Sequence, residues 1–95
     1  MATYILLSRL SGEGLDDPTD LQTYARAVSD RIKSDCPGVT WKQSFATTGS
    51  VDVVDVVESN DPSQIAKAAL IIRSLGYADT ETLVATPWSA FIDSL

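Results

Sequence analysis

The sequence predicts an α+β fold, and three observations support this. Segments with strand and helix patterns follow one another in the order β-α-β-β-α-β, with a short helical tail. The two long helical segments begin alike, at Asp17-Pro18-Thr19 and Asp61-Pro62-Ser63, which gives the chain an internal twofold pattern. A tight turn at residues 48–50 links the middle strands and requires an antiparallel pair, which disfavours a flavodoxin-like parallel sheet. We therefore expect a ferredoxin-like plait: a four-stranded antiparallel sheet, two helices on one face and a short C-terminal helix.

The first half of this order rests on clear local signals. Residues 3–10 are β-branched, aromatic or aliphatic at nearly every position up to Ser8, which predicts a strand covered on both faces. A loop with Gly12 and Gly14 follows. Asp17 and Pro18 predict a helix start, with apolar residues at helical spacing from there to about Lys33. Residues 36–38, Cys-Pro-Gly, end that helix.

The second half repeats the pattern. Residues 39–47 alternate, with Trp41 and Phe45 on the same side, as in a half-exposed edge strand, and residues 51–58 form the strongest strand signal. The helix that starts at Asp61-Pro62 should end at Gly76, and residues 79–85 predict the fourth strand. In the tail, Trp88, Phe91, Ile92 and Leu95 have helical spacing, and we expect this helix to clamp the C-terminus onto the rest of the chain.

Length and composition predict one small globular domain over residues 1–95. The chain is 44% hydrophobic and 21% charged, the balance of an ordinary folded protein. No run approaches the roughly 20 apolar residues of a membrane span, and the start of the chain lacks the basic region of a signal peptide. We therefore expect a cytoplasmic protein that does not bind membranes.

Charge and residue usage exclude several function classes. The chain has 7 Lys plus Arg against 13 Asp plus Glu, a net charge of -6, which opposes binding to a nucleic-acid backbone. Without histidine and with one cysteine, it cannot form an intrachain disulfide, a Cys/His zinc site, a histidine-ligated haem site or a histidine base. Cys36 is expected to be partly exposed near Lys33, with no base beside it. We expect neither a cofactor nor a catalytic thiol.

The apolar character of both central strands predicts a second copy of the chain, because two helices protect only one side of a sheet. With Thr3 opposite Glu58, two sets of side chains separate. The aliphatic set is assigned to the helix side and consists of Ile5, Leu7, Val54 and Val56. The mixed set is assigned to the helix-free side, facing a partner or ligand, and consists of Tyr4, Leu6, Ser8, Val51, Val53, Asp55 and Val57. We expect a twofold homodimer, packed sheet to sheet or edge to edge into a barrel.

Asp55 stands out as a carboxylate in the middle of the most hydrophobic strand. One interpretation is structural, as a salt-bridge partner or the wall of a hydrated cavity. The other is functional, as a polar anchor or base for a small ligand. Arg9 could pair with Asp52, or with Asp55 if the register shifts. The candidates for a ligand or dimer face are therefore Asp55, Tyr4, Leu6, Ser8, Val53, Arg9 and Asp52.

Three functions fit these features. We favour a non-catalytic dimeric binding or interaction module, with a sheet-side cleft for a small apolar or aromatic molecule or a protein partner. The alternative is a cofactor-free α/β-barrel enzyme, monooxygenase-like or isomerase-like, with Asp55 as its base. A purely regulatory or assembly domain differs from the first only in what fills the cleft.

Several short motifs in order resemble one known family. They are residues 3–10, Gly49-Ser50-Val51-Asp52 leading into the third strand, the helix start at residues 60–62, and residues 79–83. Together they cover nearly the whole chain and resemble the GYD domain family, small bacterial and archaeal proteins of unknown function. Gly49 and Asp52 fit the glycine and aspartate of the family name, while Val51 stands where the family has tyrosine. The resemblance implies a dimeric plait related to stress-responsive and monooxygenase-like barrels, and it implies no particular reaction.

Overall fold

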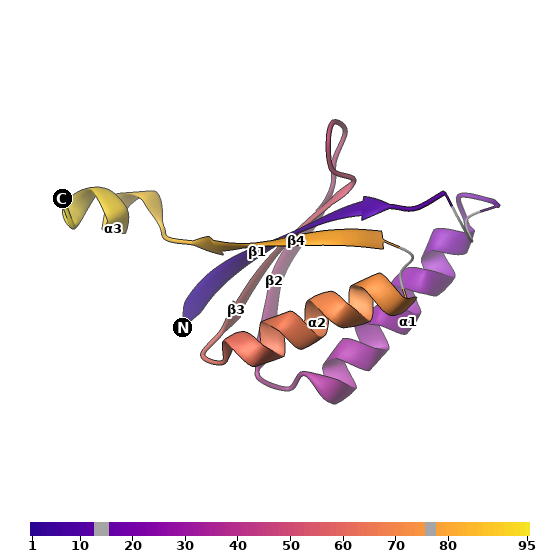
Figure 1. Ribbon diagram of the computed structural model, residues 1–95, viewed down its shortest axis with the longest axis horizontal. Coiled ribbons are helices and arrows are strands. Elements are labelled where there is room, and N and C mark those ends of the chain that lie inside the picture. Colours follow the sequence, from indigo (N-terminus) through magenta and orange to yellow (C-terminus); the bar gives the residue numbers. More distant parts are fainter. Residues whose placement is uncertain (13–15, 76–77) are drawn as a thin grey trace.

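A computed structural model describes residues 1–12, 16–75 and 78–95 and confirms the predicted α+β plait (Figure 1). The predicted glycines at positions 14 and 76 lie outside these residues. The strands pair antiparallel in the order β2-β3-β1-β4, so β1 and β3 are central. The elements are β1 (Ala2–Leu10), α1 (Asp20–Asp35), β2 (Val39–Ala46), β3 (Val53–Ser59), α2 (Pro62–Leu75), β4 (Ala78–Ala85) and α3 (Trp88–Asp93).

The register of the central strands agrees with the prediction, because Thr3 pairs with Glu58 and Leu6 with Asp55. The assignment of the two faces, however, was wrong. Most of the mixed set is buried on the helix side, namely Tyr4, Leu6, Ser8, Asp55 and Val57, while Val51 and Val53 are half-buried. No helix of the described residues covers the aliphatic set (Figure 1). The reason lies in α2, whose small and branched side chains pack closely on the mixed set; they are Ile65, Ala68 and Ile72.

A β-bulge changes the facing of the edge strand. The pairing of β2 with β3 shifts between Trp41 and Gln43, so that two residues of β2 take the place of one. Trp41 therefore shares the helix side with Ser44, which pairs with Asp55, while Phe45 pairs with Val54 on the opposite face. The strict alternation predicted for residues 39–47, with Trp41 and Phe45 on one side, was wrong because it allowed for no bulge.

The β2–β3 loop is tied to the end of β1. β3 begins at Val53 and not at the predicted position 51. Val51 and Asp52 belong to the loop, where both accept hydrogen bonds from Thr47. The Thr47 hydroxyl donates to the Val51 carbonyl (2.7 Å), and the Thr47 backbone N–H donates to the Asp52 carbonyl (2.9 Å). Gly49 in this loop has a φ of 125°, a left-handed conformation that favours glycine. The loop projects beyond the sheet in Figure 1.

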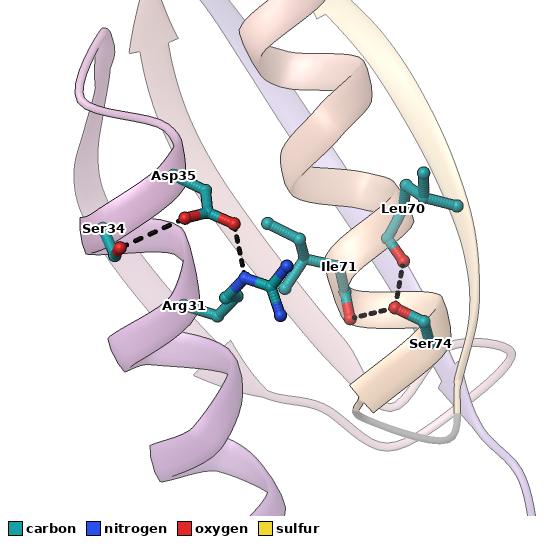
Figure 2. A network of polar contacts seen from close by, with 6 residues as sticks. All are labelled: Arg31, Ser34, Asp35, Leu70, Ile71 and Ser74. Carbon is teal, nitrogen blue, oxygen red and sulfur yellow. Dashed lines mark hydrogen bonds and ion pairs between the residues drawn. The ribbon is translucent and has the colours of Figure 1, made fainter.

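The two long helices differ in how they meet the sheet. α2 packs on β4 and β3, whereas α1 packs mainly on α2. Figure 2 shows Ile71 of α2 pointing toward α1, where Arg31 forms an ion pair with Asp35. Within α1, whose residues are all described, Ile32 alone is buried. α1 thus stands off the sheet and leaves space beneath it.

The predicted start is confirmed for α2, which begins at Pro62, but α1 begins later than predicted, at Asp20, with Thr19 as its N-cap and no side-chain cap hydrogen bond. In α2 the Ser63 backbone N–H and hydroxyl donate to Asp61 Oδ1 at 2.9 and 2.7 Å. At α1 the Thr19 backbone N–H and hydroxyl donate to Asp17 Oδ1 at 2.8 and 2.7 Å, and a tight turn over residues 18–19 leads into the helix at Asp20. These hydrogen bonds lower the pKa of the Asp61 and Asp17 carboxyls, because they stabilise the ionised form.

The tail helix does not clamp onto the rest of the chain, and that prediction was wrong. α3 extends from β4 at one end of the molecule, away from the two long helices (Figure 1). Its apolar side chains are exposed: Trp88 at 75%, Phe91 at 45%, Ile92 at 44% and Leu95 at 84%. The helical spacing is present, but the chain's own surface does not cover this apolar face.

No helix among the described residues is long and apolar enough to cross a membrane. The cytoplasmic location expected from the sequence stays a prediction.

The α2 start provides a test of the local signals. We expect Asp61→Ala to lower the urea midpoint of unfolding at neutral pH, because the carboxylate that accepts the Ser63 hydrogen bonds is lost. The pKa of Asp61 is below its ordinary 3.8 in the folded chain, so its stabilising contribution is full above that value and disappears as the pH falls through the lowered folded-state pKa. The difference between wild type and variant should therefore shrink in acid.

The matched control is Asp61→Asn, whose amide oxygen can still accept the backbone hydrogen bond. It should keep more stability than Asp61→Ala and show no such pH dependence. Equal midpoints for wild type and Asp61→Ala at neutral pH would contradict the assigned role.

Candidate functional site

The space between α1 and the sheet is a cavity of about 610 Å³, here called the α1 cavity. Its size is within the range of small-molecule pockets, roughly 300 to 1,000 Å³. The α1 wall is mostly apolar and includes Leu21, Tyr24, Ala25, Val28 and Ile32. The sheet side contributes Ser8, Leu10, Trp41, Ser44, Val53 and Asp55. Three of the predicted site residues, Ser8, Val53 and Asp55, therefore meet in one cavity, on the helix side of the sheet.

Asp55 is the charged group on the sheet side of this cavity. It is 6% exposed, and it accepts a hydrogen bond from Trp41 Nε1 to Oδ1 at 3.3 Å. The same indole N–H lies 2.8 Å from Ser44 Oγ, and Ser44 also hydrogen-bonds to the carboxylate. The bulge in β2 makes this cluster possible, because it turns Trp41 and Ser44 to one face.

Burial raises the pKa of the Asp55 carboxyl, because the charged form loses hydration. Hydrogen bonds from Ser44 and Trp41 lower the pKa and partly oppose this rise. Of the two structural roles expected for Asp55, the structure shows a cavity wall held by neutral donors, and not a salt bridge with Arg9.

Ser8 lies beside Asp55 in the sheet. Its partner on β3 is Val53, two residues from Asp55, and diagonal neighbours of this kind are about 7 to 8 Å apart. Ser8 is 3% exposed, and its Oγ has no hydrogen-bond partner among the described residues. A buried hydroxyl without a partner costs free energy, on the order of 1 to 3 kcal/mol.

The other predicted site residues lie elsewhere. Tyr4 and Leu6 belong to the core beneath α2. Arg9 and Asp52 do not pair with each other, so the pairing expected from the sequence was wrong. Arg9 Nε donates to the Ser50 carbonyl at 2.8 Å, and Asp52 Oδ2 accepts the Leu10 backbone N–H at 2.8 Å. Both side chains fasten the β2–β3 loop to β1.

Cys36 also differs from its prediction. It is 1% exposed and not partly exposed, and it lines the α1 cavity where α1 ends. Burial raises the pKa of its thiol, and the positive charge of Lys67 only partly opposes this. The thiol is therefore protonated at neutral pH, which is unsuited to nucleophilic chemistry.

The opposite face of the sheet carries a second feature, here called the open face. Its apolar residues are Ile5, Leu7, Phe45, Val54, Val56 and Leu83, and the register places Glu81 beside Leu7 and Gln43 beside Val56 on the edge strands. The four central side chains shield one another in part, while Phe45 is 47% and Leu83 40% exposed. At the edge strand, Lys42 Nζ lies 3.9 Å from Glu58 Oε1. The open face is thus an apolar surface with charged residues at its border.

Sequence reasoning missed the residues that complete the cavity. Trp41 and Ser44 are three positions apart, which in a regular strand places them on opposite faces. The sequence carries no signal for the bulge that brings them together. The α1 wall, with Tyr24 and Val28, was predicted only as a core-facing stripe.

No group of three His, Cys, Asp or Glu side chains in the described parts of the chain is arranged to hold a metal ion.

Comparison with known proteins supports the fold and gives the family. The chain is 33% identical over 95 residues to the "glutamine synthetase and cystathionine beta-lyase binding protein" of Thermus thermophilus, covering 100% of this chain and 99% of that protein. The crystal structure of TTHA0845, also from Thermus thermophilus, is similar, with a TM-score of 0.60 and 26% identity over 92% of this chain and 95% of that one. The crystal structure of FFRP-DM1 shares the fold, with a TM-score of 0.56 and 19% identity over 90% and 100% of the two chains.

The family comparison agrees with the motifs noted in the sequence. The match to the GYD domain runs over residues 4–95, from the first strand through the tail helix. It includes both features described above, the α1 cavity and the open face. The chain belongs to the GYD domain family.

Proposed function

We propose that this protein is a homodimeric, non-catalytic interaction module in which a second copy of the chain covers the open face. The observation that carries the proposal is the open face itself, which is apolar across both central strands and extends to Phe45 and Leu83 on the edges. A face that pairs with a copy of itself about a twofold axis must be self-complementary. An apolar centre bordered by Lys42 and Glu58, residues of opposite charge, meets that requirement.

Burial of the open face would stabilise a dimer. A fully buried aliphatic or aromatic side chain gains about 1.5 to 3 kcal/mol over an exposed one. The central residues are already half-buried, so each contributes a fraction of this amount, and Phe45 and Leu83 contribute more. A stable interface buries about 800 Å² on each partner, which is more than six partly shielded side chains supply. A second apolar element must therefore take part.

We assign that role to α3. It follows β4 directly, so it continues from the strand that carries Leu83. Trp88 and Phe91 lie 6.0 Å apart, ring centre to ring centre, and form a compact aromatic pair on an exposed helix. In the proposed dimer, α3 of each copy packs against the other copy and extends the interface beyond the sheet.

The relative from Thermus thermophilus suggests the kind of partner. That protein is named for binding glutamine synthetase and cystathionine β-lyase, and it is 33% identical to this chain over its full length. We propose that this chain likewise binds a metabolic enzyme, with these two as the first candidates. The dimer would present each surface twice, which suits binding to an oligomeric enzyme.

A cofactor-free enzyme with Asp55 as base is the second candidate. One observation favours it: burial raises the pKa of the Asp55 carboxyl, which moves it toward the range where a carboxylate works as a general base. Trp41 and Ser44, however, already donate to this carboxylate and reduce its basicity. We therefore keep binding as the proposed function.

Substitutions that introduce a positive charge on the open face test the proposed dimer. Phe45→Lys and Ile5→Lys should each weaken dimerisation at least about tenfold, because a twofold interface receives every added charge twice. Phe45 is the safer site for folding, since it is already 47% exposed. Sedimentation equilibrium should give twice the chain mass for wild type and the single mass for the variants.

Leu70→Lys is the matched control, since Leu70 is a 55% exposed leucine on α2. It should leave the dimer intact. A wild-type chain that stays monomeric at high concentration, or a dimer disrupted by Leu70→Lys and not by Phe45→Lys, would overturn the proposal.

The role of α3 is tested by the double variant Trp88→Ala and Phe91→Ala. Dimerisation should weaken at least about tenfold, because two aromatic contacts are lost from each copy. In the monomeric Phe45→Lys background, the same double substitution should leave the urea midpoint unchanged. A lowered midpoint there would show that α3 packs on its own chain instead.

The enzyme partner is tested with purified glutamine synthetase and cystathionine β-lyase, each immobilised for biolayer interferometry. We expect saturable binding of the wild-type dimer to at least one of them, with a Kd of about 1 µM or tighter. Serum albumin on the same surface is the control for nonspecific adhesion. If both enzymes behave like albumin, the partner assignment is wrong, and the dimer is judged separately by sedimentation.

A further inference from the structure

We propose that the α1 cavity binds a small uncharged molecule that has an apolar body and one hydroxyl group, with the hydroxyl held between Ser8 and Asp55. The α1 cavity lies on the helix side of the sheet, opposite the open face. The inference therefore goes beyond the proposed dimer and does not depend on it.

The first argument is the Ser8 hydroxyl. It is buried, it lines the cavity, and it has no hydrogen-bond partner among the described residues. Most buried hydroxyls in native proteins are hydrogen-bonded, because an unmade bond costs free energy. Alanine would fill the same position without this cost. A polar ligand in the cavity gives the hydroxyl a partner and so explains the serine.

The second argument is the chemistry of the neighbouring carboxylate. Asp55 has two oxygens with about four lone-pair positions, and Trp41 and Ser44 use only part of this capacity. Asp55 can accept one further hydrogen bond, while Ser8 can donate one. A ligand hydroxyl does both at once, donating to Asp55 and accepting from Ser8. An ammonium group can only donate, and a carboxylate would be repelled by Asp55.

The third argument is the remainder of the cavity. Away from the polar cluster of Ser8, Ser44 and Asp55 most of the wall is apolar, including Leu10, Val28, Ile32 and Ile72, while Tyr24 and Ser29 add hydroxyl groups on the α1 side. The single other charged residue among the described lining residues is Lys33 of α1, whose side chain is exposed. The volume of about 610 Å³ leaves room for an apolar group in addition to the hydroxyl. The walls thus favour an apolar body such as a substituted phenyl ring.

The test uses two probes with nearly the same body, 4-propylphenol and 4-propylanisole. The anisole carries a methyl ether in place of the hydroxyl, so it can accept but not donate. We expect 4-propylphenol to bind the wild-type chain at least about tenfold more tightly by isothermal titration calorimetry and to raise its melting temperature. Amide shifts in NMR spectra should appear at Ser8, Asp55 and α1 rather than on the open face.

Ser8→Ala is the diagnostic variant. It removes a buried hydroxyl without a partner, so the free protein should be as stable as wild type or more stable. Both probes should bind at least about threefold more weakly, because each ligand oxygen accepts from Ser8 and that hydrogen bond is lost. The preference for phenol over anisole should remain, since it comes from donation to Asp55. Ser29→Ala is the matched control: Ser29 lines the same cavity from α1, its side chain is exposed, and its loss should leave both affinities unchanged.

Asp55→Asn supplies the second variant, because its amide can still accept from the ligand but has fewer acceptor positions. It should reduce phenol affinity more than anisole affinity. The proposal is overturned if wild type binds neither probe, if it binds both equally, if Ser8→Ala leaves both affinities unchanged, or if Asp55→Asn keeps the full preference for phenol. Sedimentation of the same samples reports the dimer independently, so failure of one proposal is distinguishable from failure of the other.

Discussion

A β-sheet has two faces, and the described residues of this chain form two long helices that could cover them. α2 lies close on one face and completes the core with Leu6 and Val57. α1 packs on α2 and stands away from the sheet, so even the helix side is only partly filled. Within the described part of the chain, no helix covers the opposite face (Figure 1). Incomplete cover on both sides is the constraint behind every functional feature described above.

The two uncovered regions differ in chemistry. The open face is aliphatic and aromatic, with opposite charges at its border, as expected of a surface that meets a protein. The α1 cavity is concave, with apolar walls and a few polar groups placed together at Ser8, Ser44 and Asp55, as expected of a pocket for a small molecule. One sheet thus separates two surfaces suited to different kinds of partner. This separation allows a protein contact and a ligand site to be tested one at a time.

Hydrophobicity alone predicts the wrong face of the sheet to lie beneath the helices. Ile5 and Val56 are purely aliphatic, and by hydrophobicity alone they belong beneath a helix. The structure instead buries Ser8, Asp55 and Ser59 there. Ser59 is satisfied by the Gly38 carbonyl at 2.8 Å and by the Asp61 backbone N–H at 3.0 Å, and Asp55 by Trp41. Gly38 and Trp41 come from segments distant in the sequence, so no local pattern reveals that Ser59 and Asp55 can be buried with hydrogen-bond partners.

Sequence was enough to predict the order of the elements, the pairing of the central strands, the Asp61-Pro62 start of α2 and the family, because these depend on periodicity, local hydrogen bonds and short motifs. It also pointed to Asp55 as the unusual residue of β3. Three-dimensional packing was needed to learn which face the helices cover, that a bulge turns Trp41 and Ser44 toward Asp55, and that α1 leaves a cavity and α3 extends away. Those outcomes depend on how side chains far apart in the chain fit together, and fit is a property of packing that periodicity does not encode.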